Sequence, residues 1–502
     1  KAGGHQRASG HQASLTAPER QGNGDMGANL RDFEFVVTEI DRIRQAIKAK
    51  TKLSNRADYV YGLPSPSGIG MVPIGIAAAR KFRDIAKRAL KQDPALAARV
   101  DTQIVQKTLE HIFQQEVLKN RKQLSQSLAD KMVSRAIAHV RKNKLKTTTH
   151  FHACLLPDDP DAEQFSVGPV SFIRTDVFLS RKEEQLKIYT KGVEQHYLEQ
   201  RKEQFEELTP KERQKERSRV RKSAQGFEAD LRKYYKQYPW IAEIEVPDFE
   251  KKKSELAASL CIKTSLNILR LFFSWRLAES VTLGYSRQRP SRTASLVENG
   301  GALDVTVHFP FWRPRNEKEW VQKMCTGKSG AWLATARSLL PYLLSTTTPL
   351  LYQRYINAFW WYGEAATQEE VPHLRIISFC NALEAFLATK QSDISDQVAR
   401  RAAQLLSLRD DGEQWDVRIK QLYDLRSSLV HGRTAAFDET VSTQIGWGTK
   451  IVRGALMEGL SWTLYLAQNQ RPETLDEIHA RLELDLPRYC RGEFRNAPDA
   501  SA

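Results

Sequence analysis

The stretch Tyr423-Asp-Leu-Arg-Ser-Ser-Leu-Val-His-Gly432 lies in the part of this sequence with the most regular apolar pattern. Apolar residues through and before it recur mostly at steps of three and four, which is the spacing of one face of an α-helix. These residues are Trp415, Ile419, Leu422, Leu425 and Leu429. A glycine directly after the histidine is expected to end such a helix. The stretch therefore predicts an amphipathic helix that stops beside His431.

Four further apolar stripes surround this helix after a break at 346–349. They comprise an aromatic stripe (Tyr352, Tyr355, Phe359, Trp360), a second (Ile376, Phe379, Cys380, Leu383, Phe386, Leu387), a third (Ile394, Val398, Ala402, Leu405, Leu406) and a last (Trp447, Ile451, Val452, Ala455, Leu456, Leu460). Short loops between helices favour antiparallel neighbours. Residues 346–470 are therefore predicted to form an antiparallel all-α bundle.

Within the stretch, Arg426 and His431 are separated by four residues. Together with the order of the helices and the preceding Asn381-Ala-Leu-Glu384-Ala-Phe-Leu segment, this motif resembles the Apea-like branch of the HEPN (higher eukaryotes and prokaryotes nucleotide-binding) superfamily. HEPN domains are helical bundles with an Arg-x(4 to 6)-His motif, and the Apea-like branch often reads Arg-Ser, then Val-His-Gly. Many active HEPN nucleases have Asn, Asp or His directly after the arginine, where this chain has Ser427.

The resemblance implies metal-independent RNA cleavage, in which the ribose 2′-hydroxyl attacks the neighbouring phosphate. His431 would be the general acid or base and Arg426 would stabilise the anionic phosphorane, while Glu384 would orient Arg426 or tune the charge of the site. Five helical residues at about 100° each separate the two motif side chains by roughly 140°. A homodimer that pairs motifs from two chains, as the resemblance implies, is therefore expected to complete the site. No metal or other cofactor is expected.

These site residues also have purely structural interpretations. Arg426 can bind carbonyl groups at a helix end, His431 can be a polar cap beside Gly432, and Glu384 can form an ion pair across the bundle. The leading hypothesis is a cytoplasmic endoribonuclease, toxin-like or antiviral, whose preceding regions restrain or trigger it through a regulatory protein or ligand. The alternatives are a non-catalytic RNA- or nucleotide-binding module and a structural interaction protein. RNA-binding residues are not assigned.

Composition limits the setting of this 502-residue chain. Its net charge of +16 attracts phosphates, although the same cations can simply solvate long helices. The longest apolar stretches, 67–79 and the region around 271–275, are shorter than the roughly 20 residues that span a membrane, so no membrane partner is expected. The cysteines are scattered, without a CxxC pair, which favours a reducing cytoplasm. They are Cys154, Cys261, Cys325, Cys380 and Cys490.

The amino-terminal third is predicted to be a tail followed by helices. Residues 1–25 are rich in Gly, Gln, Ser and Ala and precede Met26, which is typical of a tag, a read-through or a disordered tail. Residues 26–147 have helical periodicity, interrupted by a breaker-rich loop at 62–70. Gly68-x-Gly70 lacks the third glycine of a dinucleotide fingerprint because position 73 is Pro73.

The middle region, 148–345, is predicted to mix helices with a small antiparallel β element. Segments 149–156 and 165–173 flank the turn-rich Pro157-Asp-Asp-Pro-Asp161 and are expected to pair as a hairpin. On the first strand one face would carry three potential metal ligands, but no fourth is evident. These are His150, His152 and Cys154.

The rest of the middle region contains exposed and buried helices. Residues 181–236, interrupted by Pro210, are charged and predict two exposed helices or a helical hairpin, more a structural arm than an RNA surface. Its basic residues are Arg217, Arg219, Arg221 and Lys222. A buried helix is expected at 254–285 and a strand at 300–309. Thr326-Gly-Lys-Ser329 is no phosphate loop, because position 322 is Gln322. Residues 471–502 are a carboxy-terminal extension. The predicted fold class is therefore mainly α.

Overall fold

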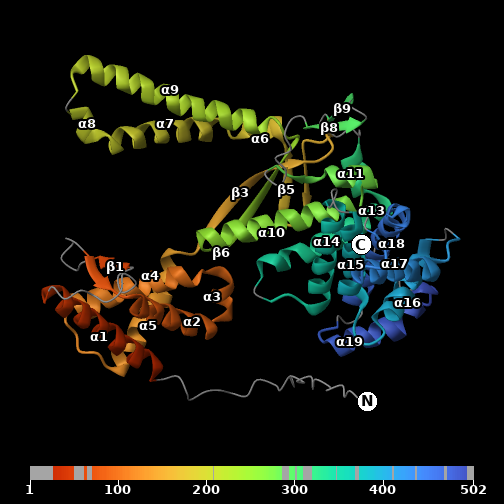
Figure 1. Cartoon of the computed structure of the whole chain (residues 1–502), viewed down its shortest axis with the longest axis horizontal. Coiled ribbons are helices and arrows are strands. Elements are labelled where there is room, and N and C mark those ends of the chain that lie inside the picture. The colour runs from red at the N-terminus through yellow and green to blue at the C-terminus, as the bar shows by residue number, and fades with distance from the viewer. Residues whose placement is uncertain are drawn as a thin grey trace. The chain divides into compact units, whose positions relative to one another are not determined.

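The computed structural model describes residues 27–49, 61–64, 71–206, 208–284, 293–299, 302–308, 319–345, 347–367, 372–409, 412–435, 438–468 and 472–494. The chain is mainly helical with a small antiparallel sheet, which confirms the predicted fold class. It divides into two compact units, the first made of 1–146 with 248–253 and the second of 147–247 with 254–502 (Figure 1). The predicted tail at 1–25 lies outside the described residues.

The first unit is a small helical bundle with a short hairpin. Its elements are α1 (Ala28–Lys48), β1 (Tyr61–Pro64), β2 (Met71–Ile74), α2 (Ile76–Lys91), α3 (Pro94–Arg99), α4 (Thr102–Phe113), the π-helical turn η2 (Gln114–Lys119) and α5 (Gln126–Asn143). Phe33 of α1, Phe82 of α2 and Phe113 of α4 are fully buried, with ring centroids 5.3 to 6.1 Å apart. This aromatic cluster explains the predicted helical periodicity of 26–147.

The hairpin of β1 and β2 was not predicted. The two strands are antiparallel, with Leu63 opposite Val72, and flank the glycine- and proline-rich segment, of which 65–70 lie outside the described residues. Each strand has only four residues and contains a proline, and β1 lies largely within the predicted breaker-rich loop at 62–70.

The second unit contains a sheet of five strands in the order β4-β5-β6-β3-β7. They are β3 (Lys146–Leu155), β4 (Gln164–Val167), β5 (Val170–Arg174), β6 (Trp240–Phe249) and β7 (Thr282–Leu283). The predicted pairing of 149–156 with 165–173 is wrong, because 165–173 folds back on itself as β4 and β5. Gly168, with φ +61°, forms the two-residue turn with Pro169, and this local partner replaces the distant one.

The turn-rich 157–161 segment has a different role from the predicted hairpin turn. The indole N–H groups of Trp240 and Trp320 donate to the carbonyl of Pro157, at 2.8 and 3.2 Å. The buried Asp159 carboxylate accepts the backbone N–H groups of Glu319, at 3.2 Å, and Val321, at 3.0 Å. The loop thereby fixes the start of the helix α12 (Trp320–Cys325) against the sheet.

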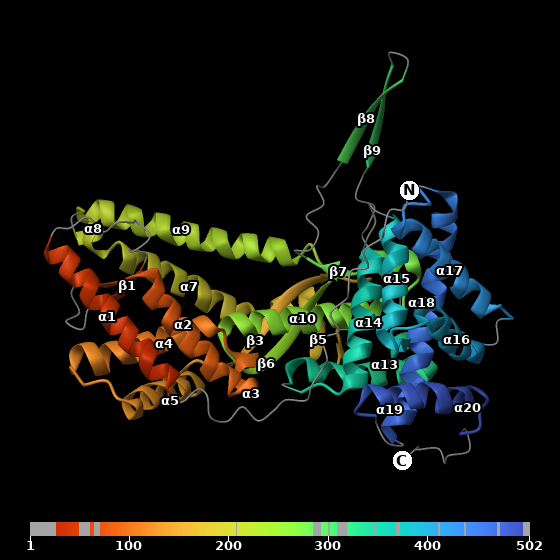
Figure 2. The same cartoon turned by 60° about the horizontal axis from the view of Figure 1, so that its bottom comes forward.

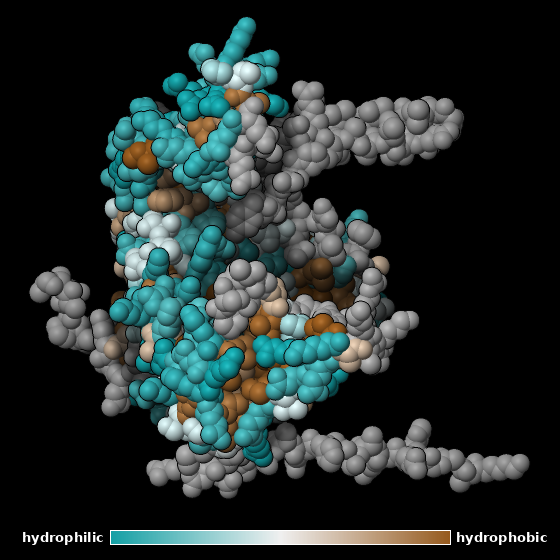
Figure 3. Space-filling view, turned by 90° about the vertical axis from the view of Figure 1, so that its left-hand side faces the viewer, coloured by the Kyte–Doolittle hydropathy of each residue, from teal (hydrophilic) through white to brown (hydrophobic). Residues whose placement is uncertain are grey.

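The charged segment 181–236 forms the predicted helical hairpin. After α6 (Thr175–Arg181), its helices are α7 (Glu183–Gln200), α8 (Lys202–Glu206) and α9 (Pro210–Tyr235). Helices α7 and α9 lie side by side in both views (Figures 1 and 2), and the hydroxyl of Thr190 donates to Glu228 at 2.8 Å. Pro210 starts α9 behind a capping box formed by Thr209 and Glu212. Figure 3 shows mainly hydrophilic residues on the end of this arm, at the top of the view.

Residues between the sheet and the bundle form α10 (Lys251–Arg270), α11 (Trp275–Ser280), β8 (Thr293–Asn299), β9 (Ala302–His308), α12, α13 (Gly327–Leu339) and the 3₁₀-helix η3 (Leu340–Leu344). The predicted strand at 300–309 is confirmed as β9, which pairs with β8; residues 300, 301 and 309 lie outside the described part. The single predicted helix at 254–285 is instead α10, α11 and the short strand β7.

The carboxy-terminal helices form a bundle, and their five apolar stripes are confirmed as helices. They are α14 (Leu350–Thr367), α15 (Pro372–Leu387), α16 (Ile394–Leu406), α17 (Trp415–Val430) and α18 (Glu439–Gln468), with the 3₁₀-turn η4 (Ser407–Arg409) after α16. Figure 2 shows α14, α15, α17 and α18 close together. Within the described residues, no helix has both the length and the apolar character to cross a membrane.

Three short elements follow the bundle: α19 (Leu475–Ala480), the π-helical turn η5 (Arg481–Asp485) and α20 (Leu486–Cys490). They bury Ile478, Leu482 and Leu486, and α20 packs against α16. The described part of the predicted extension 471–502 is therefore in contact with the bundle.

Candidate functional site

The helix that carries the Arg-x4-His motif ends at the histidine, as its sequence predicts. Helix α17 stops at Val430, His431 occupies the cap position, and Gly432 has φ +68°. The N–H of Gly432 donates to the carbonyl of Leu429 at 3.2 Å. The N–H of the next residue, Arg433, donates to the carbonyl of Ser428. These two bonds define a Schellman motif, which needs a left-handed residue where the glycine stands.

Arg426 lies one helical turn and a half before this end and is half-buried. Its Nε is buried and has no hydrogen-bond partner among the described residues. Glu384 of α15 is also half-buried and interacts electrostatically with Arg426, although no ion pair within 4.0 Å joins them in the described part of the chain. The structure therefore brings the predicted Arg426 and Glu384 to the same contact between α15 and α17.

Tyr423 completes this group, because its hydroxyl interacts with the carboxyl group of Glu384 and lowers the pKa of that group. Burial raises the pKa of Glu384 above its ordinary value, and the charge of Arg426 and the interaction with Tyr423 oppose that rise. Burial also raises the pKa of Tyr423, which stays a neutral phenol. Glu384 is thus a carboxyl group whose ionisation is held back by its surroundings.

Tyr423 lies in the motif stretch, but its role was not predicted from the sequence. It precedes Arg426 by three residues, which places both side chains on one side of α17, and this spacing is the signal that could have found it. The aromatic ring is buried against α15, with its hydroxyl 3.4 Å from the carbonyl of Cys380.

The position of Glu384 near the end of α15 depends on an arginine from another helix. Arg354 of α14 donates to the carbonyls of Glu384 and Phe386, at 3.3 and 3.2 Å, and also to the carbonyl of Ala388. The carbonyl of Glu384 also accepts the backbone N–H of Ala388 at 3.0 Å, and Arg354 adds bonds to the carbonyls at the end of this helix. Glu384 is therefore held on a capped, rigid part of the bundle.

His431 is not part of this group. Its side chain is exposed, and no described residue forms a hydrogen bond or an ion pair with its imidazole. Among the described residues no hydrogen bond or ion pair joins it to Arg426 or Glu384. One chain thus contributes an exposed imidazole and, separately, a half-buried guanidinium beside a carboxyl group.

Two of the three potential metal ligands of β3 have other surroundings: His150 is hydrogen-bonded and Cys154 is buried. The rings of His150 and His152 lie on one face with centroids 6.5 Å apart, but Nε2 of His150 is 2.6 Å from the hydroxyl of Ser254. Cys154 is buried, and burial raises the pKa of its thiol to about 12. Within the described residues, no group of three or more His, Cys, Asp or Glu side chains is placed to hold a metal ion.

The basic residues of α9 stand in solvent. Arg217, Arg219, Arg221 and Lys222 are all exposed, and Arg219 lies 3.8 Å from Glu216 one turn earlier. Such exposed pairs contribute little to stability. The arrangement agrees with the interpretation of this segment as a charged arm.

No family model, curated protein or solved structure matches this chain. The resemblance to the Apea-like HEPN branch thus rests on the residues of the motif and remains a prediction.

Proposed function

We propose that the carboxy-terminal bundle is a HEPN-type, metal-independent endoribonuclease of the Apea-like kind. The observation that supports this most is the exposure of His431 at the end of α17, where a glycine stops the helix and leaves the imidazole free for a substrate. The half-buried Arg426 beside Glu384 supplies the cation that an anionic transition state needs.

The proposed reaction breaks one phosphodiester bond. An imidazole of His431 takes the proton of a ribose 2′-hydroxyl, and the 2′-oxygen attacks the adjacent phosphorus. Arg426 stabilises the negative charge of the phosphorane. The bond from phosphorus to the 5′-oxygen then breaks, and that oxygen takes a proton from a second imidazole, which leaves a 2′,3′-cyclic phosphate and a 5′-hydroxyl.

A homodimer supplies that second imidazole and brings the separated groups together. Within one described chain no hydrogen bond or ion pair joins His431 to Arg426, and we propose that a second copy of the motif completes the site. Val430, directly before His431, is 54% exposed and offers apolar surface at this end of α17. Glu384 is a positioning residue in this proposal, because it acts on Arg426 and not on the RNA.

The setting that we propose is a cytoplasmic, toxin-like or antiviral effector. All five cysteines are free thiols, which suits a reducing compartment. An enzyme that cuts cellular RNA must be restrained, and the regions before the bundle are the proposed point where a regulatory protein or ligand acts.

The second candidate is a non-catalytic RNA- or nucleotide-binding module. The contacts of Arg426 with its own bundle favour it, because Glu384 and Tyr423 already give this guanidinium a structural environment. In that case the motif stabilises the bundle, and phosphate binding depends on other cations.

The deciding experiment incubates wild type and the His431→Ala variant with mixed structured and single-stranded RNAs in excess chelator, followed by mass spectrometry of the product ends. We expect cyclic-phosphate ends from wild type and at least a roughly 100-fold slower reaction from the variant. Arg426→Ala is expected to slow cleavage by about 100-fold or more.

Two controls separate chemistry from folding. His139→Ala removes an exposed histidine of α5 and should leave cleavage unchanged. Arg426→Lys keeps the charge but not the planar fork, so partial activity in a stable protein would support electrostatic stabilisation. Binding of RNA without any cleavage, equal in wild type and in His431→Ala, would replace the nuclease proposal by the binding module.

A further inference from the structure

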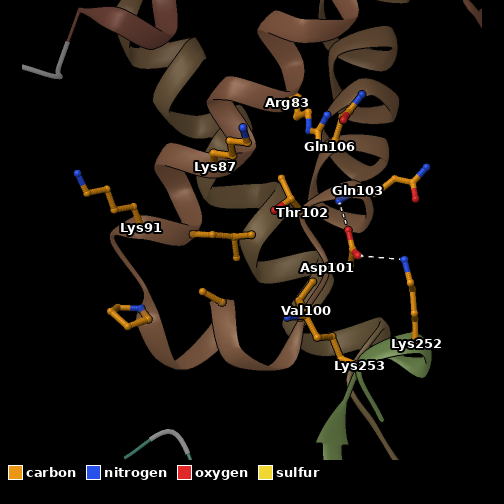
Figure 4. Close-up of a pocket in the computed structure, with 13 residues that line it drawn as sticks. Arg83, Lys87, Lys91, Val100, Asp101, Thr102, Gln103, Gln106, Lys252 and Lys253 are labelled. Atoms are coloured by element: carbon orange, nitrogen blue, oxygen red, sulfur yellow. Dashed lines mark hydrogen bonds and ion pairs between the residues drawn. The ribbon is translucent and has the colours of Figure 1, made fainter. Parts of the chain in front are cut away.

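The first unit contains a pocket of about 940 Å³ whose walls are strongly basic. Arg83, Lys87 and Lys91 of α2 form one side, and Lys252 and Lys253, from the 248–253 segment of the same unit, form another (Figure 4). Asp101, at the start of α4, is the one carboxylate among the side chains that line the described pocket.

The cations of α2 form a regular row. They stand four residues apart, so each is about 6 Å further along the helix on nearly the same side. All three are exposed, and in the described part of the chain none has a carboxylate within the 4.0 Å of an ion pair. Their charges are therefore available to a ligand.

Asp101, the acidic residue of the pocket, already has partners within the protein. Asp101 caps α4 by accepting the backbone N–H of Gln103 at 2.8 Å, and it lies 3.6 Å from Nζ of Lys252 (Figure 4). The hydrogen bond from Gln103 and the nearby Lys252 and Lys253 lower the pKa of Asp101. It neutralises one of five cations, and the pocket keeps an excess of positive charge.

The remaining lining residues limit what the pocket can recognise. Leu90 and Val100 are buried and apolar, while Gln103 and Gln106 offer amide groups. No aromatic side chain lines the pocket, so a base finds no surface on which to stack. Recognition must rest on charge, which suits phosphate groups, and a row of cations fits repeating phosphates better than one compact phosphate.

We propose that this pocket binds the phosphodiester backbone of an RNA strand. Binding of a phosphodiester backbone is inferred from the charges of the pocket alone, whereas the choice of RNA rests on the proposed function. Because the pocket lies in the first unit and the motif in the second, binding here is separable from cleavage.

The test measures fluorescence anisotropy of a labelled 2′-O-methyl oligouridylate with the full-length chain over a range of salt concentrations. This probe lacks the 2′-hydroxyl that would attack the phosphate, so it cannot be cleaved by the proposed reaction. Its binding is therefore measured independently of cleavage. For the triple variant Arg83→Ala, Lys87→Ala and Lys91→Ala we expect at least tenfold weaker binding. The slope of log affinity against log salt should fall by about 2, at roughly 0.7 per lost phosphate contact.

A matched triple variant controls for net charge. Lys119→Ala, Lys131→Ala and Lys142→Ala remove three exposed lysines of the same unit that do not line the pocket. This control should keep the salt slope of wild type. Lys253→Glu, on the opposite wall, is an independent pocket variant and should also weaken binding in a protein that melts normally.

Three results would overturn the proposal. Equal losses in the two triple variants would show a general charge effect. Inorganic triphosphate that displaces the probe as well as unlabelled oligouridylate does, at equal phosphate concentration, would indicate a compact phosphate site. Binding of the RNA probe that is as tight in the pocket triple variant as in wild type would show that the pocket does not bind RNA.

Discussion

The backbone N–H of Arg433 donates to the carbonyl oxygen of Ser428 at 2.8 Å, across the turn that ends α17. This bond forms only because the chain reverses at Gly432, whose φ is +68°. The same turn leaves His431 exposed at the helix end, so the proposed catalytic side chain depends on a glycine that touches no substrate.

Gly432→Ala should lower the free energy of unfolding by about 1 kcal/mol, because a left-handed conformation costs an L-residue roughly 1 to 2 kcal/mol. A Cβ at this position would meet nothing within 4 Å, so strain of the backbone is the only cause. Urea denaturation measures the change. Gly446→Ala, in the interior of α18 and equally open, should instead stabilise by about 0.5 to 1 kcal/mol. A loss of stability in both variants would contradict this account.

Arg401→Ala should destabilise the bundle by about 3 kcal/mol, the lower end of the range for breaking a buried pair. Arg401 is buried and donates to the carbonyl of Leu387, to Thr389 at 3.0 Å and to Glu483 through Nε at 3.1 Å. The matched variant is Arg400→Ala. The guanidinium of Arg400 lies 2.7 Å from the same Glu483, but the Arg400 side chain is 54% exposed. We expect it to cost less than about 1 kcal/mol. Similar melting temperatures of the two variants would argue against a structural role for burial.

Glu384→Gln should gain stability relative to wild type as the pH rises from about 4 to about 7. Burial raises the pKa of Glu384 in the folded protein, so the folded state holds the proton more tightly than the unfolded state does. Stability is therefore greatest below the ordinary glutamate pKa and falls as the pH rises toward the raised value. The amide does not ionise and avoids this loss. Denaturation at both pH values checks the trend, which Glu439→Gln, at an exposed carboxylate, should not reproduce.

Periodicity was enough to predict the bundle, because each helix there has a buried stripe of several apolar residues. The end of α17 was predictable for a local reason, since Gly432 alone supplies the left-handed residue. The strand partners were not predictable, because β5 pairs with β6, with Ser171 opposite Glu243. The whole charged arm, 181–236, separates these two strands in the sequence. No local pattern encodes a pairing at that separation.

The candidate site likewise has a part that was predictable from the sequence and a part that was not. The positions of Arg426 and His431 on one helix followed from the sequence, but the interaction between Tyr423 and Glu384 depends on how α15 packs against α17. The basic pocket was missed because Lys252 and Lys253 join α2 and α4 from far along the chain. Contacts of this kind require the tertiary structure.

Completion of the first unit by 248–253 has a consequence for its synthesis. The N–H of Glu250 donates to the carbonyl of Arg99 at 3.0 Å, and the ring of Phe249 lies against the guanidinium of the same arginine. The ribosome releases residues in order, so the helices of 27–143 leave it before the segment that completes their unit. The ribosome must therefore translate all of 147–247 before Lys252 and Lys253 can form the second wall of the basic pocket.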